Sequence, residues 1–289
     1  SFMGYDDRTM AKALDAAEGT GVKLMVSCPG LRENPEETVK KFNDHPSVAG
    51  YFLKDEPSCE EYADLAERAR VINKASGGKH PVYINLFPIF AKDKQFGCAG
   101  YQEYIDRYMD ELAPVVGYIS YDNYPVTESG LREGFYNNLE IVSEAAKANG
   151  IPFWAFALSV KHQVSVHLAP YARPDRASLR LQIFSDLAYG AQGIQYFTYL
   201  QPGPGGPEDF MHYADAPLMY EGKRTDIFDL IAELNQEVQN LSWVFLGAEK
   251  QKVIHIGKYL PRPYQRDDEF PDNVVHDQYL GFEYRLEEN

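Results

Sequence analysis

The sequence has few of the features that mark several large protein classes. It contains three cysteines, Cys28, Cys59 and Cys98, and they form neither a CxxC pair nor a zinc-like cluster with histidine. We therefore expect free or buried thiols. No apolar run approaches the ~20 residues that span a bilayer, so no membrane span is expected. No signal peptide opens the sequence, and since a processed secreted protein would look the same, the compartment is left open.

Basic residues are also scarce: 28 Lys and Arg stand against 43 Asp and Glu, a formal charge of -15. Nucleic-acid binding depends on clustered Lys and Arg that release counterions, so we expect no nucleic-acid partner. There is no GxSxG nucleophile motif. The segment 201–206 is too rich in proline for a phosphate-binding loop. His162 and His167 have no acidic ligand nearby in sequence, so we expect neither a metal nor another cofactor.

The sequence alternates short apolar runs with amphipathic stretches, which is typical of a parallel sheet with crossover helices. The apolar runs are nearly continuous, as in strands covered on both faces. The predicted strands are Val22–Ser27, Val48–Lys54, Val82–Phe87, Tyr118–Tyr121, Phe153–Ser159 and Ile194–Tyr199. The predicted helices are Arg8–Glu18, Pro35–Asn43, Cys59–Asn73, Tyr101–Leu112, Leu131–Asn149, Pro174–Tyr189 and Asp226–Leu241.

This order predicts an α/β fold of the (β/α)8 TIM-barrel type, lacking or curtailed in its first strands, because the chain opens on a helix. We expect the barrel over residues 1–245 and a C-terminal extension, or the start of an accessory β domain, over residues 246–289, with one strand-like run at Val253–Ile256. Residues Ser58 to Glu61 fit a capping box. Gly150 and Gly190 suit left-handed helix ends.

Active sites of such barrels lie at the carboxyl ends of the strands. Asp55 and Glu56 directly follow the run VAGYFLK, and Pro57 ends that strand. A carboxyl group shielded there by neighbours such as Tyr51, Tyr83 and Phe87 would have the raised pKa that a general acid needs. The alternative is that both acids only favour the amino terminus of the next helix through its dipole.

Asp122 ends another apolar run, YISYD, which belongs to the predicted strand at Tyr118–Tyr121. Two carboxylates from different strand ends can act together across one glycosidic bond, as acid and base or as acid and nucleophile. The alternative is an Asx turn that ends the strand, completed by Asn123 and Pro125.

Other polar and aromatic residues at strand ends are candidates for substrate binding. Tyr121 and Phe197 are further candidates for a stacking floor, but residues alternate between the two faces of a strand, so at least half of these aromatic side chains should be structural. The predicted binding residues are Asp55, Asn85, Asn123, Tyr124, Trp154, His162 and Tyr199.

Four segments together resemble the later strands of β-galactosidase-like barrels in the large retaining clan of glycoside hydrolases: HPSVAGYFLKDEPS, YISYDNYP, IPFWAFALS and LRLQIFSDLAYGAQGIQYFTY. The helix TDIFDLIAELNQEVQNL is similar to the one that follows the last strand of such barrels. The resemblance implies a glycosidase acting on carbohydrate, in a secreted or periplasmic setting.

In that clan the acid/base glutamate follows strand four and the nucleophile follows strand seven. By this resemblance, Glu56 matches the acid/base, and Asp55 stands where asparagine is usual. The presumed strand seven ends in LSVKH, which has no carboxylate. Asp122 could replace the nucleophile, or Glu208 or Asp209 could do so from the loop after strand eight.

Three hypotheses follow. The first is a glycoside hydrolase acting on an oligosaccharide or polysaccharide, with Glu56 as general acid/base and Asp122 as the second carboxylate. The second is a non-catalytic carbohydrate-binding barrel, in which aromatic side chains supply the affinity. The third is a lyase or aldolase that uses Lys54 or Lys161 as a base or Schiff-base amine. The oligomeric state is left open.

Overall fold

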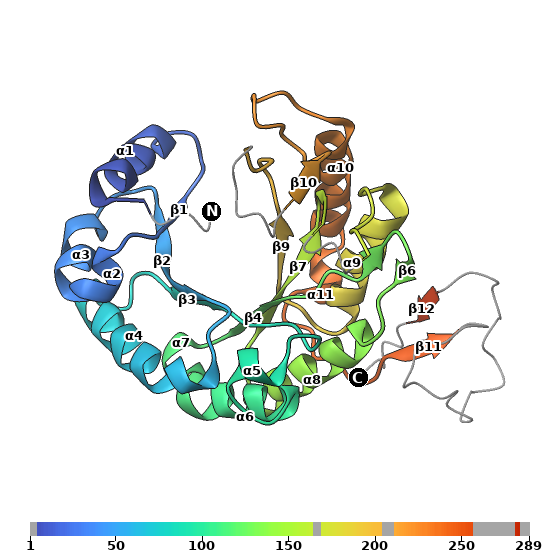
Figure 1. Cartoon of the computed structure of the whole chain (residues 1–289), viewed down its shortest axis with the longest axis horizontal. Coiled ribbons are helices and arrows are strands. Elements are labelled where there is room, and N and C mark those ends of the chain that lie inside the picture. Colours follow the sequence, from blue (N-terminus) through green and yellow to red (C-terminus); the bar gives the residue numbers. More distant parts are fainter. Residues whose placement is uncertain (1–4, 164–168, 204–210, 257–280, 284–289) are drawn as a thin grey trace. The chain divides into compact units, whose positions relative to one another are not determined.

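The computed structural model describes residues 5–163, 169–203, 211–256 and 281–283 (Figure 1). The chain divides into two compact units, each described by itself below. The first contains residues 1–121 and 148–151, and the second contains residues 122–147 and 152–289.

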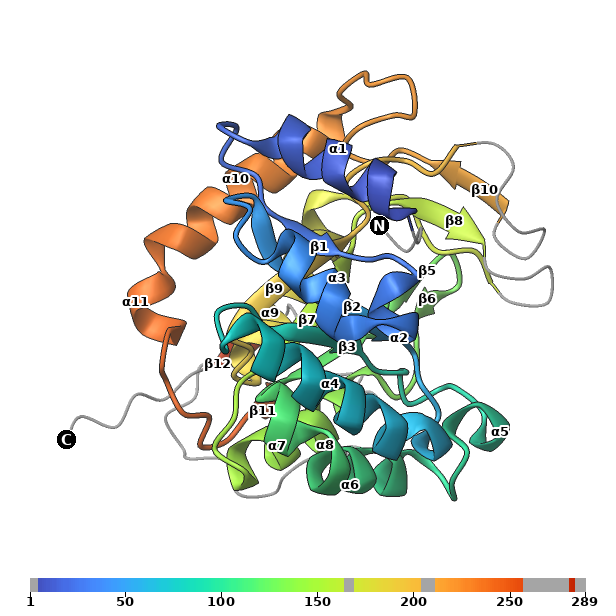
Figure 2. The ribbon, with the colours of Figure 1, turned by 90° about the vertical axis from the view of Figure 1, so that its left-hand side faces the viewer.

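The first unit is built on a parallel sheet of β1 (Leu24–Val26), β2 (Val48–Asp55) and β3 (Val82–Asn85), in that order. A parallel bridge from Leu86 to Tyr121 places β4 (Ile119–Asp122) next to β3. The helices lie outside these strands, and α4 packs on β2 and β3 (Figures 1 and 2). They are α1 (Asp7–Ala17), α2 (Gly30–Glu33), α3 (Pro35–Phe42), the 3-10 turn η1 (Cys59–Glu61), α4 (Tyr62–Ser76), α5 (Asp93–Phe96), α6 (Tyr101–Glu111) and α7 (Ala113–Val116).

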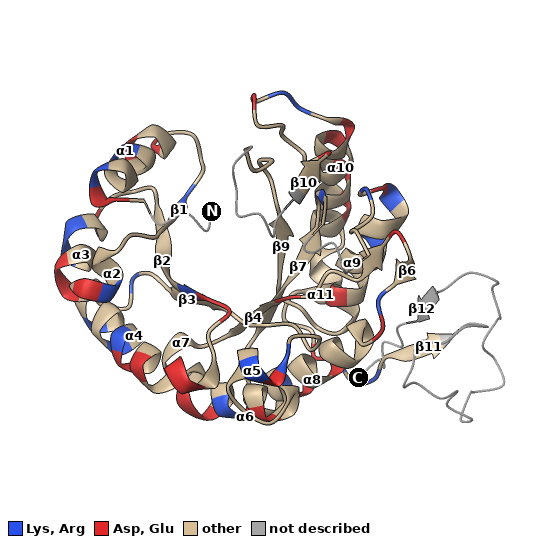
Figure 3. Cartoon of the chain, in the orientation of Figure 1, with Lys and Arg blue, Asp and Glu red and all other residues tan. Residues whose placement is uncertain are grey.

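The sheet of the first unit is closely packed because its strands are apolar on both faces. All four residues of β3 are buried. Gly50 of β2 lies so close to its neighbours that a Cβ atom there would meet Pro81 O, just before β3, at 2.5 Å and Met25 Sδ of β1 at 2.7 Å. Charged residues lie mostly on helices such as α3, α4 and α6, while the strands carry few (Figure 3). The acidic composition of the chain is therefore accommodated on helix surfaces.

The second unit contains a parallel pair, β7 (Phe153–Leu158) with β9 (Gly193–Phe197). Leu179, Ile183 and Leu187 of the helix after β7 form a core with Ile227 and Leu234 of the helix after β9. Three short antiparallel pairs complete the unit: β5 (Val126–Thr127) with β6 (Gly130–Leu131), β8 (Lys161–Gln163) with β10 (Met211–Ala214), and β11 (Ile254–Ile256) with β12 (Gly281–Glu283). The helices are α8 (Phe135–Ala148), α9 (Arg176–Ala188), α10 (Asp226–Asn240) and α11 (Ser242–Phe245).

All six predicted strands are present, and the predicted α/β class with parallel pairing is confirmed. The structure shows partial parallel sheets; the closed eight-stranded barrel and the division into residues 1–245 and 246–289 stay predictions. The capping box is confirmed, since the Ser58 amide donates to Glu61 Oε2 at 2.9 Å. Gly150 and Gly190 have positive φ angles of 63° and 97°, as predicted.

Some predicted boundaries are wrong. The helix expected from Leu131 begins at Phe135, because residues 130–131 form strand β6 instead. The helix expected from Pro174 begins at Arg176, with Asp175 as its cap. Among the described residues, no helix is long and apolar enough to cross a membrane.

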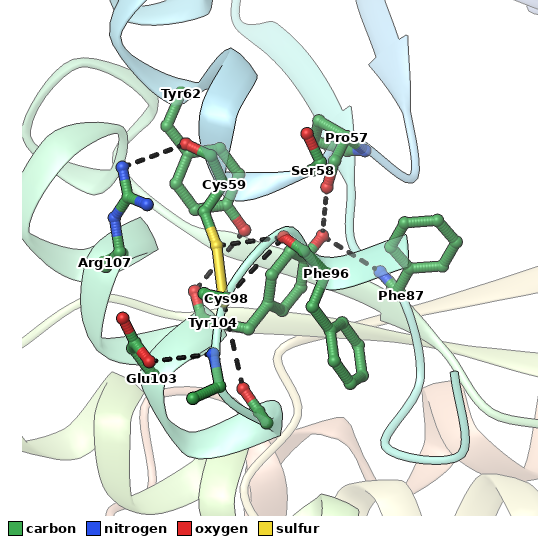
Figure 4. Close-up of a disulfide and its surroundings, with 12 residues drawn as sticks. Pro57, Ser58, Cys59, Tyr62, Phe87, Phe96, Cys98, Glu103, Tyr104 and Arg107 are labelled. Carbon is green, nitrogen blue, oxygen red and sulfur yellow. Dashed lines mark hydrogen bonds between the residues drawn. A yellow bond between two sulfur atoms is a disulfide. The ribbon is translucent and has the colours of Figure 1, made fainter. Parts of the chain in front are cut away.

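The expectation of three thiols is wrong for two of them: Cys59 and Cys98 form a disulfide (Figure 4). Cys28 is a free, buried thiol, as expected. The 39-residue separation of the pair is not a motif, so the sequence does not reveal it. The chain between the two cysteines contains α4, β3 and α5, and the disulfide joins the two ends of this segment.

The disulfide closes a loop of 39 residues, for which the chain-entropy estimate is about 4 kcal/mol of stabilisation. We expect the C59S/C98S double variant to lose about 2–4 kcal/mol of unfolding free energy, measured by urea denaturation. Dithiothreitol should destabilise the wild type and leave the double variant unchanged. Equal stability of wild type and variant without reductant would contradict a structural disulfide.

Candidate functional site

The end of β2 places two acidic residues side by side in sequence, Asp55 and Glu56. Glu56 has a φ angle of 45°, in the left-handed region that residues other than glycine rarely adopt. Its backbone amide donates to Asn85 O at 2.8 Å, at the end of β3. Because such a conformation costs about 1 kcal/mol or more, surrounding contacts must maintain it.

Several contacts hold the segment that follows Glu56. The Tyr104 hydroxyl donates to Pro57 O at 2.8 Å (Figure 4). The disulfide links Cys59 to Cys98, in the loop that leads from β3 to α6. Arg107 Nη2 donates to Cys59 O at 3.0 Å. The chain after β2 is thus attached to α6 and to the loop before it.

Asp55 ends a line of hydrogen-bonded side chains from three neighbouring strands. Asn85 Nδ2 donates to Asp55 Oδ1 at 3.3 Å, and the Ser120 hydroxyl donates to Asn85 Oδ1 at 3.0 Å. Tyr83 Oη lies 2.9 Å from Ser120 Oγ. Asn85, Ser120 and Tyr83 are 2%, 0% and 5% exposed. These contacts are internal to the protein rather than part of its surface.

Burial raises the pKa of Asp55 to about 6, although the Asn85 hydrogen bond and the nearby Lys54 charge act in the opposite direction. We expected a raised pKa for a carboxyl group at this strand end, and Asp55 has one. The predicted residues Asp55, Glu56 and Asn85 are brought together here. Sequence reasoning missed Ser120; the signal for it was a single serine inside the apolar run of β4.

Asp122 is the last residue of β4 and directly follows Tyr121, which pairs in parallel with Leu86. The ends of β3 and β4 therefore lie at the same edge of the sheet. Asn123 is 3% exposed, and its Nδ2 donates to Asn138 Oδ1 at 2.9 Å in the second unit. This bond gives Asn123 a structural role.

Tyr124 and His162 belong to an aromatic cluster in the second unit, with Tyr171, Phe197 and Tyr213. Tyr124 stacks on Phe197 with ring centroids 5.8 Å apart, and the His162 ring lies 5.2 Å from that of Tyr213. His162 is 2% exposed, and burial lowers its pKa to about 4. The imidazole is therefore neutral at neutral pH.

Trp154 and Tyr199 have different surroundings. The Trp154 indole covers Gly193, where an added Cβ atom would lie 2.7 Å from it. The Tyr199 side chain is 56% exposed and lies beside the Phe228 ring, with centroids 6.2 Å apart. Tyr121 is buried, as expected for the structural share of the aromatic candidates. Tyr199 is the predicted aromatic residue with the most surface to offer a ligand.

The end of β7 has no carboxylate of its own. Ser159 and Val160 are buried, and the Ser159 amide donates to Phe197 O at 2.7 Å. Lys161 follows, and its ammonium group lies 2.6 Å from the carboxylate of Glu128, which the β5–β6 hairpin carries. Sequence reasoning missed Glu128 because it is 33 residues away from Lys161. Glu208 and Asp209, the other predicted substitutes, lie outside the described part of the chain.

Both lysines considered for Schiff-base chemistry are ion-paired: Lys161 with Glu128, and Lys54 with Glu61 at 2.9 Å. His167 is not among the described residues. Within the described ranges, no group of three or more His, Cys, Asp or Glu side chains is arranged to hold a metal ion.

A further buried acid, Asp186 of α9, was not predicted to be special. It is 1% exposed, and burial raises its pKa well above the usual value. Its Oδ2 atom has no hydrogen-bond partner among the described residues. Burial therefore favours the protonated, neutral form of the Asp186 carboxyl group.

The raised pKa of Asp55 predicts a pH dependence of stability. The folded protein binds this proton more tightly than the unfolded chain, so the contribution of Asp55 falls as pH rises from about 4 through about 6. The D55N variant lacks this titration. The stability of D55N minus that of the wild type should therefore grow by up to about 3 kcal/mol between pH 4 and pH 7.5 in urea denaturation. Parallel pH profiles would contradict the assignment.

Comparison with known proteins relates part of the chain to a family. The β-galactosidase family model matches residues 99–241, just under half of the chain. A search of curated protein sequences found no significant match. The family match confirms the predicted resemblance to β-galactosidase-like glycoside hydrolases and supports the expected class of enzyme, a glycosidase.

Solved structures show the same fold. A β-galactosidase from the psychrophilic Marinomonas ef1 is 14% identical, with a TM-score of 0.57 over 82% of this chain and 52% of that chain. The chain therefore spans about half the length of that enzyme. A candidate α-L-fucosidase from Bacteroides thetaiotaomicron is 13% identical, with a TM-score of 0.52 over 82% of this chain and 74% of that one. At these identities the similarity concerns the fold.

Proposed function

We propose that this protein is a glycosidase that cleaves an oligosaccharide or polysaccharide, with Glu56 as general acid/base and Asp122 as the second carboxylate. The observation that carries the proposal is the conformation of Glu56. A positive φ angle at the end of a parallel strand, maintained by a hydrogen bond to Asn85 and by the disulfide that follows, supports a functional rather than a helix-capping role.

In the proposed reaction, Glu56 donates a proton to the glycosidic oxygen as the bond to the anomeric carbon breaks. Asp122 either attacks that carbon or takes a proton from the attacking water. A carboxyl separation of about 5–5.5 Å would give retention, and about 6.5–9.5 Å would give inversion. The parallel bridge between Leu86 and Tyr121 supports the choice of Asp122, because it aligns the ends of β3 and β4.

For substrate contacts we propose Tyr199, whose exposed ring could stack on a sugar, together with Asp55 and Asn85 at the end of the sheet. The other predicted binding residues, Asn123, Tyr124, Trp154 and His162, would support the substrate site from the packed positions described above. The disulfide supports a secreted or periplasmic location, since disulfides persist in oxidising compartments.

The E56Q variant keeps the size of the side chain and removes the proton that Glu56 would donate. We expect kcat to fall by about 100-fold or more on aryl glycosides or polysaccharides, with an unchanged unfolding midpoint. D122N should lower kcat by a comparable factor. E128Q tests whether Glu128, the acid beside Lys161, acts as the second carboxylate instead of Asp122.

The matched control is E60Q, because Glu60 is an exposed acid in the same segment. It should retain full activity. An E56Q variant as active as E60Q would remove Glu56 from the mechanism.

The alternative is a carbohydrate-binding protein without catalysis, which the end of β7 favours because Ser159 and Val160 occupy it without a carboxylate. Calorimetric binding of a glycan, with no product released from a broad glycoside panel, would support this alternative. In either case Y199A should weaken glycan binding, by about 1–3 kcal/mol if its ring stacks on a sugar.

A further inference from the structure

We propose that Tyr83, Ser120 and Asn85 form an oriented hydrogen-bond chain whose donors all point toward Asp55, and that they are positioning residues which hold Asp55 as an anion next to Glu56. In sequence these residues are scattered over β2, β3 and β4. The effect of this hydrogen-bond chain on catalysis rests on the proposed glycosidase activity. The hydrogen-bond chain itself can be tested in the protein without substrate.

The direction of each hydrogen bond follows from the charge of Asp55. An ionised carboxylate only accepts, so the group that Asn85 presents to it at 3.3 Å must be its NH2. The Asn85 carbonyl oxygen then faces Ser120 and accepts the serine hydroxyl hydrogen at 3.0 Å. Because that hydrogen is used, Tyr83 must donate to Ser120 Oγ at 2.9 Å. One negative charge thus orients three side chains.

Burial gives this orientation its strength. Asn85, Ser120 and Tyr83 are nearly inaccessible, so water competes little for these bonds. A line of aligned donors stabilises the carboxylate and opposes the desolvation that raises the Asp55 pKa. If Asp55 took up a proton, the polarity of the chain would no longer be imposed. The chain is therefore coupled to the ionisation of Asp55.

The neighbouring charges act in the same direction. Lys54 lowers the pKa of Asp55 through its positive charge, and it is itself paired with Glu61 of η1. Tyr83, the titratable group from β3, acts through Ser120 and Asn85. Asp55 directly precedes Glu56, so the proposed hydrogen-bond chain fixes the side chain next in sequence to the proposed proton donor.

The test is an NMR titration of the Asp55 carboxyl carbon in the free, full-length protein labelled with 13C-aspartate, with D55N used to assign the signal. The wild-type midpoint should lie at about 6. S120A removes the hydroxyl that donates to the Asn85 carbonyl oxygen, and we expect the Asp55 midpoint to rise by about 0.5–1 pH unit. Y83F removes only the distal donor and should give a smaller rise.

The matched control is Y118F. Tyr118 is also buried, and its hydroxyl donates to Val82 O at 2.9 Å on the same sheet, but it is outside the proposed chain. Its loss should lower stability without moving the Asp55 midpoint. An unchanged midpoint in S120A, or an equal shift in Y118F, would overturn the proposal.

Activity separates this inference from the proposed function. If both hold, the acidic limb of the pH–rate profile in S120A moves in the same direction as the NMR midpoint. If the Asp55 midpoint shifts in S120A but the wild-type protein cleaves no glycoside, the result supports the hydrogen-bond chain and rejects the proposed glycosidase activity. If S120A cleaves glycosides and its Asp55 midpoint equals that of the wild type, the proposed hydrogen-bond chain is rejected, whereas the proposed glycosidase activity is not.

Discussion

The end of the first unit's sheet depends on the contacts that Asn85 makes to β2. Its backbone carbonyl accepts the Glu56 amide, and its side chain joins Asp55 to Ser120. One residue therefore determines both the backbone position of Glu56 and the polar surroundings of Asp55. Removing either bond would take a hydrogen-bond partner from a polar group at this edge, and for a buried group such a loss costs more than the bond contributes. The hydrogen bond from Tyr104 to Pro57 and the Cys59–Cys98 disulfide also hold the segment that follows β2.

Much of the fold could be predicted because parallel strands buried on both faces leave a strong apolar signal. VAGYFLKD and FWAFAL are both strands within a residue of the predicted limits. The two-residue strands β5 and β6 could not be predicted in this way, since they are too short to show a period and belong to a hairpin of polar residues. Helix starts were missed where a cap or a short strand precedes the apolar face, as at Asp175 and Leu131.

The candidate site was predictable where it lies at strand ends and not where it depends on distant pairs. Asp55, Glu56 and Asn85 follow apolar runs, so the rule about strand ends finds them. Ser120, Tyr104 and Glu128 have hydrogen-bond partners 33 to 47 residues away in sequence, and single-sequence patterns do not reveal such pairs. His162 also follows a strand, but the sequence does not indicate that it is buried in an aromatic cluster with Tyr171.

The disulfide has a consequence for the integrity of the chain. Cys59 and Cys98 enclose α4, β3 and α5, so a protease that cuts the backbone anywhere between them does not release a fragment. The nicked protein would migrate as one species on a non-reducing gel and as two after reduction. After a surface cut by a protease, such a link would keep the strand that carries Asn85 attached to β2, which Glu56 follows.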